Sequence, residues 1–442
     1  MTNTPTSRPT ARSLVRAALP IAGFYLTGIL LGLTDLAVVG VLGTEALAAV
    51  GLGKTIVFSL LVVGFAVLSI GTVLMAEAAD AAQRGPVLLA ALLLTIPFTA
   101  IALSLPSIAE RVLRHSDYPP EVISLFAAYT QVLAWAIGPA LVFAAFKNVL
   151  VAVGRTGPIF ALSLLILVAN AVASIVLVHG IGGWGGLGVA GAAWATVGVE
   201  VGAAVVLVGV VSRGGRVRQA RLRRSEVLAR VRTILGLGWA AGAQQILESM
   251  LFVAVLYLLG LHSAAWLAAG TVAFAALELT FAVGAALGEV ASAHMAALRA
   301  TGARKAQRRL VFLTAALAVG CAGTLALLVF FLPSSVIAVF AGKSVSPEVR
   351  TLMEIVIVTT APLFIFDALQ IVFVHLLRGL RRTVLPMLFS TSCYWMVGLA
   401  GGLILTETLE LGGAGIWIGF GLGLASAAVL LGVMTARSVF LE

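Results

Sequence analysis

Three carboxylic acids lie inside apolar stretches of the chain, where an ionised side chain is costly. Asp35 lies in GILLGLTDLAVVG, Glu248 in GAQQILESMLF and Asp367 in APLFIFDALQIVFVHLLRG. A carboxylate at the centre of a bilayer costs about 2.5–3.5 kcal/mol on insertion scales, so such a residue is expected to face the interior of a helix bundle. Removal from water favours proton uptake by a carboxyl group, whereas an oxygen-rich surrounding can hold Na⁺. The three acids are therefore candidates for the exchange of H⁺ or Na⁺.

Helical spacing places other polar side chains next to these acids. Asp367, Gln370 and Arg378 fall on one helical face, and Gln244 precedes Glu248 by one turn. A single buried acid can instead be structural, as the partner of a serine, a backbone amide or an arginine. Because three acids share this unusual setting, we favour a common role in ion exchange.

The segments that carry the acids are predicted to be membrane-spanning helices. Of the 442 residues, 61% are hydrophobic and 10% are charged, whereas soluble domains carry about 25% charged residues. The strands of a membrane barrel would alternate apolar and polar residues, and these segments do not. We therefore predict an all-α polytopic membrane protein. Its twelve spans are predicted at residues 16–41, 46–76, 87–109, 121–150, 158–179, 187–211, 233–260, 264–295, 310–333, 350–377, 384–405 and 413–435.

An internal repeat predicts two pseudo-symmetric six-helix bundles. Similar motifs follow in the same order in both halves, for example LGVAGAAWA and LGGAGIWIG, at offsets between 217 and 224 residues. The predicted organisation is an N-terminal bundle at 1–211, a cytoplasmic arginine-rich linker at 212–232 and a C-terminal bundle at 233–442. An even number of spans per half gives both halves one orientation. Secondary transporters use such parallel repeats.

The net charge of +10 is explained by loops rather than by nucleic-acid binding. Lys and Arg residues concentrate on one side of the predicted topology, and this asymmetry places both termini in the cytoplasm. Lys54 is expected at the outer end of its span, with its ammonium group reaching the membrane surface. The chain contains no zinc, P-loop or nucleophile-elbow motif, so we predict that it is not an enzyme and that it has no cofactor.

The chain resembles the multidrug and toxic compound extrusion (MATE) family along nearly its whole length. The resemblance is carried by TDLAVVGVLGTEALAAVG, FKNVLVAVGRTGPIF, VANAVASIVLVHG, LLRG followed by a basic turn and a proline, and GIWIG. It implies efflux of cationic, amphiphilic drugs or metabolites in exchange for H⁺ or Na⁺, by alternating access. A bacterial cytoplasmic (inner) membrane location is expected, with the lipid bilayer and a small organic molecule as partners and a monomeric chain.

The resemblance also assigns site residues. It implies a cation site in the N-terminal half at Asp35, Asn170 and Thr196, and a second one in the C-terminal half at Glu248 and Asp367, where Na⁺ is a candidate ligand. The family often has a second Asp or Asn one turn after Asn170. Here that position is Ser174, which removes a charge from the N-terminal site.

A cationic substrate is expected to contact aromatic faces and a few polar groups. The candidate substrate-binding residues are Gln244, Phe252, Tyr257, Gln370 and Tyr394.

Two other functions are weaker hypotheses. A flippase of lipid-linked precursors in the same superfamily would line its cavity with arginines, and these spans contain almost none. An intramembrane enzyme would need paired catalytic groups, but the five histidines are scattered and lie mostly at span ends.

Overall fold

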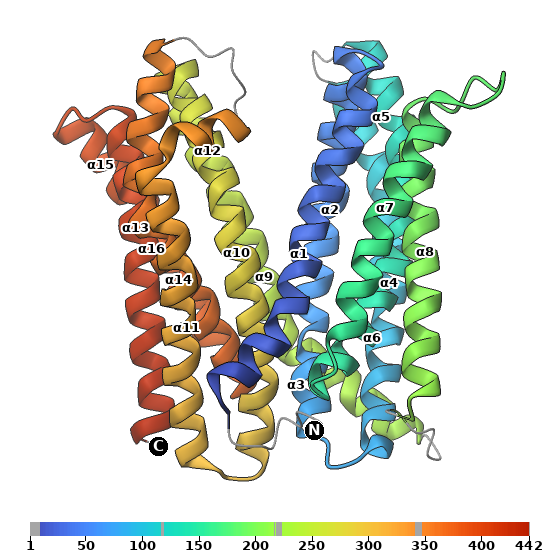
Figure 1. The fold of residues 1–442 in the computed structure, drawn as a ribbon, viewed down its shortest axis with the longest axis vertical. Helices are drawn as coiled ribbons and strands as arrows, with labels where there is room; N and C mark the ends of the chain where they lie inside the picture. Colours follow the sequence, from blue (N-terminus) through green and yellow to red (C-terminus); the bar gives the residue numbers. More distant parts are fainter. Residues whose placement is uncertain (1–8, 116–118, 216, 218–222, 341–346, 442) are drawn as a thin grey trace. The chain divides into compact units, whose positions relative to one another are not determined.

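The structure is a computed structural model that describes residues 9–115, 119–215, 217, 223–340 and 347–441. Within these ranges the chain is helical and forms no strand (Figure 1). In the described part of the chain, twelve helical stretches are long and apolar enough to cross a membrane. The predicted all-α fold with twelve spans is confirmed.

The first six spans are formed by α1 to α8. Their bounds are α1 (Ala11–Gly40), α2 (Thr44–Leu68) followed by α3 (Ile70–Glu77), α4 (Ala81–Arg114), α5 (Pro120–Leu133) followed by the 3₁₀ turn η1 (Ala134–Ala136) and α6 (Ile137–Ala152), α7 (Gly157–His179) and α8 (Val189–Arg213).

The last six spans are formed by α9 to η3, with the short helix α12 (Pro333–Phe340) between two of them. Their bounds are α9 (Arg224–His262), α10 (Ala264–Ala300), α11 (Arg304–Phe331), α13 (Pro347–Gly379), α14 (Val384–Ser392) followed by the π-helical η2 (Cys393–Ala400) and α15 (Gly401–Thr408), and α16 (Gly413–Ala436) followed by η3 (Arg437–Leu441).

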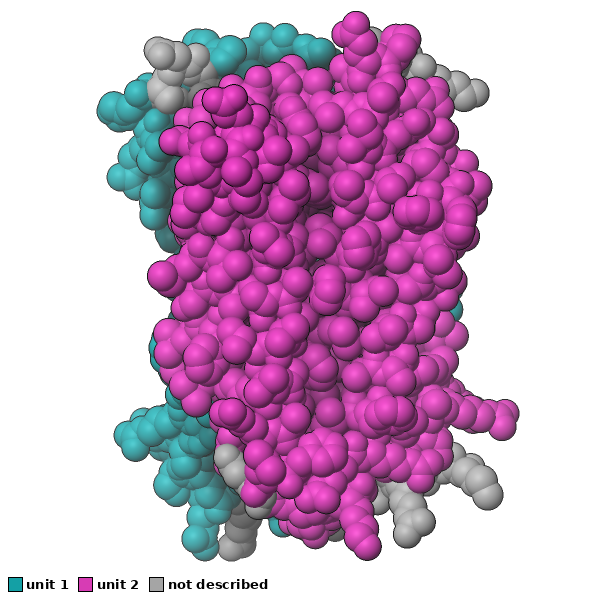
Figure 2. All heavy atoms as spheres, turned by 90° about the vertical axis from the view of Figure 1, so that its left-hand side faces the viewer, with its two compact units in different colours: residues 1–3, 23–242 teal, residues 4–22, 243–442 magenta. Residues whose placement is uncertain are grey.

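The chain forms two compact units (Figure 2). Unit 1 contains residues 23–242, and unit 2 contains the start of α1 up to Ala22 together with residues 243–442. The division therefore falls within α1 and α9. The predicted linker at 212–232 overlaps α9, which begins at Arg224, while residues 216 and 218–222 lie outside the described part of the chain. Arginine, leucine and alanine are good helix formers, so a polar segment can extend a helix beyond the membrane.

Equivalent helices pack as equivalent pairs in the two units, as expected for the predicted repeat. In unit 1, α2 packs on α5 and α6, α7 on α8, and α6 on α8. In unit 2 the corresponding pairs are α10 with α13, η2 and α15 with α16, and α13 with α16. The acids on α1, α9 and α13 are thus placed in two bundles built on the same plan.

The second span is interrupted at Ser69, where α2 ends and α3 begins. Thr72 N donates to the carbonyl oxygen of Ser69 instead of to that of Leu68, at 3.0 Å. Asn148 Nδ2 from α6 donates to the Leu68 oxygen at 2.8 Å. Because hydrocarbon offers no hydrogen bonds, a carbonyl group released from the helix needs such a protein partner.

Four glycines bring η2 and α15 into direct backbone contact with α16 in unit 2. A Cβ atom at Gly419 would clash with Gly402 Cα and lie 2.5 Å from the carbonyl oxygen of Gly398. A Cβ at Gly423 would lie 2.8 Å from Gly398 Cα. Small residues allow membrane helices to approach closely, so these glycines fix the spacing of the eleventh and twelfth spans.

Substitution of Gly419 by alanine is expected to destabilise unit 2. The added methyl group meets backbone atoms, which cannot rotate away, and overpacking of this kind costs about 1–3 kcal/mol. Gly320→Ala on α11 is the control, because a Cβ there meets no atom within 4 Å. Thermal unfolding of the purified protein in detergent should give a lower midpoint for Gly419→Ala only. Equal midpoints for the two variants would contradict the packing argument.

Candidate cation sites

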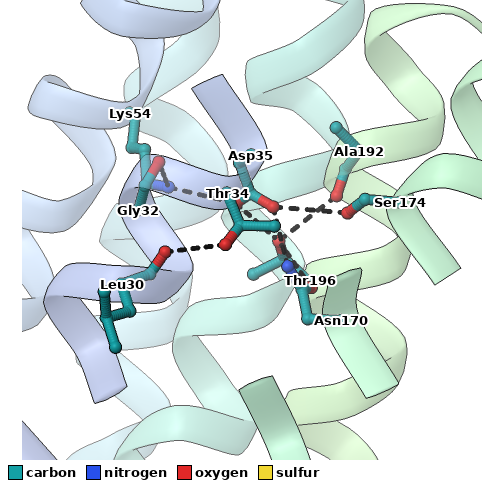
Figure 3. A network of polar contacts seen from close by, with 9 residues as sticks. All are labelled: Leu30, Gly32, Thr34, Asp35, Lys54, Asn170, Ser174, Ala192 and Thr196. Atoms are coloured by element: carbon teal, nitrogen blue, oxygen red, sulfur yellow. Dashed lines mark hydrogen bonds and ion pairs between the residues drawn. The ribbon is translucent and has the colours of Figure 1, made fainter. Parts of the chain in front are cut away.

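Asp35 of α1 is the centre of a buried polar network in unit 1 (Figure 3). Its side chain is 1% exposed. Asn170 Nδ2 donates to Oδ1 at 2.7 Å and Ser174 Oγ donates to the same oxygen at 3.3 Å. Thr196 Oγ1 lies 3.4 Å from Oδ2 as a third donor. The structure therefore brings together Asp35, Asn170 and Thr196, the residues grouped from the sequence.

The positions of the donor residues on α7 and α8 explain why their side chains meet at Asp35. Asn170 and Ser174 are four residues apart on α7 and so share one face. Thr196 lies on α8, which packs against α7. The Thr196 hydroxyl shares its single hydrogen between Asp35 and the backbone carbonyl of Ala192, which lies 3.2 Å from Oγ1. Ser174 supplies a neutral donor to the same acid.

Lys54 of α2 is a further member of the network, and its predicted location at the membrane surface is wrong. Its Nζ lies 3.0 Å from Asp35 Oδ2 and donates to the Gly32 carbonyl at 3.2 Å. The side chain is only 13% exposed, and Nζ lies 5.4 Å from the centroid of the Phe58 ring. A sequence signal for this pair was available, because an unpaired acid and a lysine within neighbouring apolar spans can neutralise each other.

Asp367 of α13 is the corresponding acid in unit 2 and is 6% exposed. Thr280 Oγ1 from α10 donates to Asp367 Oδ2 at 2.9 Å. Gln370 Nε2 lies 3.5 Å from Oδ1, one turn further along α13. Thr280 was not among the residues predicted from the sequence, since a threonine in an apolar span usually bonds only to its own helix backbone. Here its single hydroxyl hydrogen is shared between Asp367 and the Leu277 carbonyl, which lies 2.8 Å from Oγ1.

Glu248 of α9 joins Asp367 in unit 2. It is half-buried, interacts with the side chain of Gln370 and lies within electrostatic range of Asp367. Arg378, near the end of α13, also lies within its electrostatic range. The two acids assigned to the C-terminal half thus lie within electrostatic range of each other, and Gln370 interacts with both.

Tyr394 and Gln244 are two further candidate substrate-binding residues of unit 2. Tyr394 of η2 is buried, lies within electrostatic range of Glu248 and Asp367, and its hydroxyl has no hydrogen-bond partner among the described residues. Gln244 Nε2 of α9 donates to Ser390 Oγ of α14 at 3.2 Å. A buried hydroxyl without a partner is an available oxygen ligand beside two carboxylates.

The other two candidate substrate-binding residues, Phe252 and Tyr257, lie in different surroundings. Phe252 belongs to an aromatic cluster with Phe274, Trp417 and Phe420, with ring centroids 5.0–5.8 Å apart. Tyr257 of α9 is 65% exposed and is not part of this cluster. Among the described residues, no group of three or more His, Cys, Asp or Glu side chains is suitable for a metal ion.

Replacing Lys54 by methionine is expected to destabilise unit 1, because Asp35 then loses its counter-charge in a buried place. Removal of one partner from a buried ion pair costs about 3–5 kcal/mol. The double variant Lys54→Met with Asp35→Asn should regain much of this loss, since neither charge remains. Thermal unfolding of the wild type, both single variants and the double variant gives the coupling. Purely additive effects would show that the two side chains do not interact.

One known family matches most of the chain. The model of the MatE family matches two ranges, residues 20–176 and 240–404. The two matches begin 220 residues apart, which agrees with the repeat offset predicted from the motifs. Asp35 and Asn170 fall in the first match and Glu248 and Asp367 in the second.

Two similar curated proteins come from bacteria. The chain is 30% identical over 426 residues to the multidrug resistance protein NorM of Burkholderia vietnamiensis, with coverage of 94% of this chain and 91% of that protein. It is 27% identical to a probable multidrug resistance protein NorM of Rhizobium meliloti, with coverage of 95% and 92%.

Solved structures share the fold. An outward-facing multidrug resistance MATE family transporter of the MOP superfamily has a TM-score of 0.87 at 18% identity, with coverage of 99% of this chain and 96% of that chain. The eukaryotic MATE transporter AtDTX14 has a TM-score of 0.81 at 19% identity, with coverage of 97% of both chains. Together with the family match, these likenesses show that the chain belongs to the MATE family of membrane transporters.

Proposed function

We propose that the chain exports an organic, cationic and amphiphilic compound in exchange for H⁺ or Na⁺, by alternating access. The observation that carries this proposal is the buried Asp367 with its donors Thr280 and Gln370, and with Glu248 within electrostatic range. The names of the bacterial relatives, which are multidrug resistance proteins, support the drug class.

The acid pair offers a physical basis for coupling. Two carboxylates in a poorly hydrated place repel each other, so binding of a cation or a proton stabilises the pair. Thr280 and Gln370 hold Asp367 in position through their hydrogen bonds. A cationic substrate that approaches the same carboxylates competes with the bound ion. Such competition is the minimum requirement for an antiporter.

Unit 2 contains side chains that suit a cationic, partly apolar guest. The cluster of Phe252, Phe274, Trp417 and Phe420 offers aromatic faces within unit 2. Aromatic faces attract organic cations. Gln244, Gln370 and Tyr394 supply polar atoms on the neighbouring helices. Under this proposal Tyr257, with its exposed ring, contributes least of the five candidate substrate residues.

The proposal also includes the orientation of the chain in the membrane and its oligomeric state. We place both termini in the cytoplasm of a bacterium, because the basic loops then lie on the inner side of the cytoplasmic membrane. The described residues contain twelve candidate spans, in two bundles of six. We propose that a single chain is the transport unit.

Loss of either acid of unit 2 is expected to abolish ion-driven efflux. Glu248→Gln and Asp367→Asn keep the shape of each side chain but remove the charge that binds the coupling ion. Efflux of a cationic dye from everted vesicles is measured under a proton gradient and under a sodium gradient separately. The wild type should respond to one of the gradients, and both variants should fall at least tenfold.

The control is Glu407→Gln, because Glu407 is an exposed acid on α15. It should transport like the wild type. Wild-type efflux rates in both acid variants would show that the acids are structural and would refute the coupling mechanism.

The hydroxyl of Thr280 is expected to matter through Asp367. Thr280→Val keeps the side-chain volume and removes a hydrogen bond to a charged group, an interaction worth about 1.5–3 kcal/mol. The concentration of coupling ion needed for half-maximal efflux should shift about tenfold or more. Thr271→Val on the same helix is the matched control, since its hydroxyl bonds only to the Leu267 carbonyl and is exposed. Equal shifts in both variants would exclude a specific role for Thr280.

A further inference from the structure

The two units carry different charges at their buried acids. Unit 1 pairs Asp35 with Lys54 at 3.0 Å. Unit 2 places Glu248 beside Asp367, and neither acid has a lysine partner among the described residues. The N-terminal site is therefore neutral as a pair, whereas the C-terminal site contains two acids, with Arg378 within electrostatic range of Glu248.

Both oxygen atoms of the Asp35 carboxylate already accept hydrogen bonds. Oδ1 accepts from Asn170 Nδ2 and Ser174 Oγ, and Oδ2 accepts from Lys54 Nζ. Thr196 Oγ1 lies 3.4 Å from Oδ2 and shares its single hydrogen between that oxygen and the Ala192 carbonyl. An incoming metal cation would have to displace one of these donors before it could bind.

Two of the groups that contact Asp35 cannot coordinate Na⁺ through the atoms that face the carboxylate. Hard cations take oxygen ligands. The contacting atoms of Asn170 and Lys54 are nitrogen atoms that carry hydrogen. The ammonium group of Lys54 lies in contact with the carboxylate and repels a second cation there.

Lys54 is held in this place by more than the ion pair. Its Nζ donates to the Gly32 carbonyl at 3.2 Å and lies over the ring of Phe58. A Cβ at Gly32 would lie 3.5 Å from Nζ, so the lysine packs directly against the glycine of α1. With 13% of its side chain exposed, Lys54 is part of the bundle interior.

We propose that Lys54 is a built-in counter-cation that occupies the cation position at Asp35, excludes Na⁺ from unit 1 and confines the coupling ion to unit 2. Lys54 is thereby a residue that determines ion specificity. This inference rests on the proposed function for its meaning in transport, but its test is an equilibrium measurement that requires no transport.

The first arm of the test asks whether Na⁺ reaches Asp35 while Lys54 is present. The thermal unfolding midpoint of the purified full-length protein is measured with increasing NaCl, against choline chloride at equal ionic strength. A ligand that binds the folded state raises this midpoint. The Na⁺-specific rise should be the same in the wild type and in Asp35→Asn. A smaller rise in Asp35→Asn would overturn the proposal.

The second arm removes the lysine. Lys54→Met, with Lys54→Gln as a second variant should the first fail to fold, frees the position beside Asp35. Each should gain an additional Na⁺-specific rise that disappears when Asp35→Asn is added. Lys54→Arg keeps a cation and is the matched control, which should gain nothing. Absence of any gain in the neutral variants would show that Lys54 is not what excludes Na⁺.

The two proposals fail in different ways. If dye efflux is absent but Lys54→Met gains an Asp35-dependent Na⁺ response, the drug-export function is wrong and the role of Lys54 stands. If efflux depends on Glu248 and Asp367 but Asp35→Asn lowers the Na⁺ response of the lysine-containing protein, the export function stands and the role of Lys54 is wrong.

Discussion

The cost of placing a charge in hydrocarbon governs the polar chemistry of this protein. Each buried acid must find donors or a counter-charge within the bundle, because the bilayer offers neither. Asp35 meets this requirement with three neutral donors and Lys54. Asp367 meets it with Thr280 and Gln370, and its neighbour Glu248 adds a second negative charge. The same constraint explains why Asn148 caps the free carbonyl at the break between α2 and α3.

The two units share one arrangement of helices but differ in the charged groups around their buried acids. Equivalent helices pack in equivalent pairs, and the family model matches each half once. A duplicated scaffold can therefore carry a neutralised acid in one half and an acid pair in the other. Asp35 of unit 1 is in direct contact with a lysine, whereas the two acids of unit 2 have no lysine partner among the described residues. Under the proposed function we therefore assign ion coupling to unit 2.

Much of the fold followed from the sequence, because membrane spans are defined by long apolar segments and each of the twelve was found. The helix ends were less accurate. The start of α9 lies at Arg224 instead of 233, since hydropathy does not detect a helix that leaves the membrane. The grouping of Asp35, Asn170 and Thr196 followed from a family motif on three separate spans. Lys54 and Thr280 did not, because their roles depend on which helices become neighbours: α2 with α1, and α10 with α13.

Under the proposed function, substrate and coupling ion compete at the acid pair of unit 2. The most direct measurement is ion release: purified protein loaded with H⁺ or Na⁺ is mixed with a cationic dye, and the freed ion is detected with a pH indicator or a sodium electrode. Competition at the acid pair predicts release from the wild type and none from the double variant Glu248→Gln with Asp367→Asn. Undiminished release from the double variant, or dye binding to the wild type without release of either ion, would contradict it.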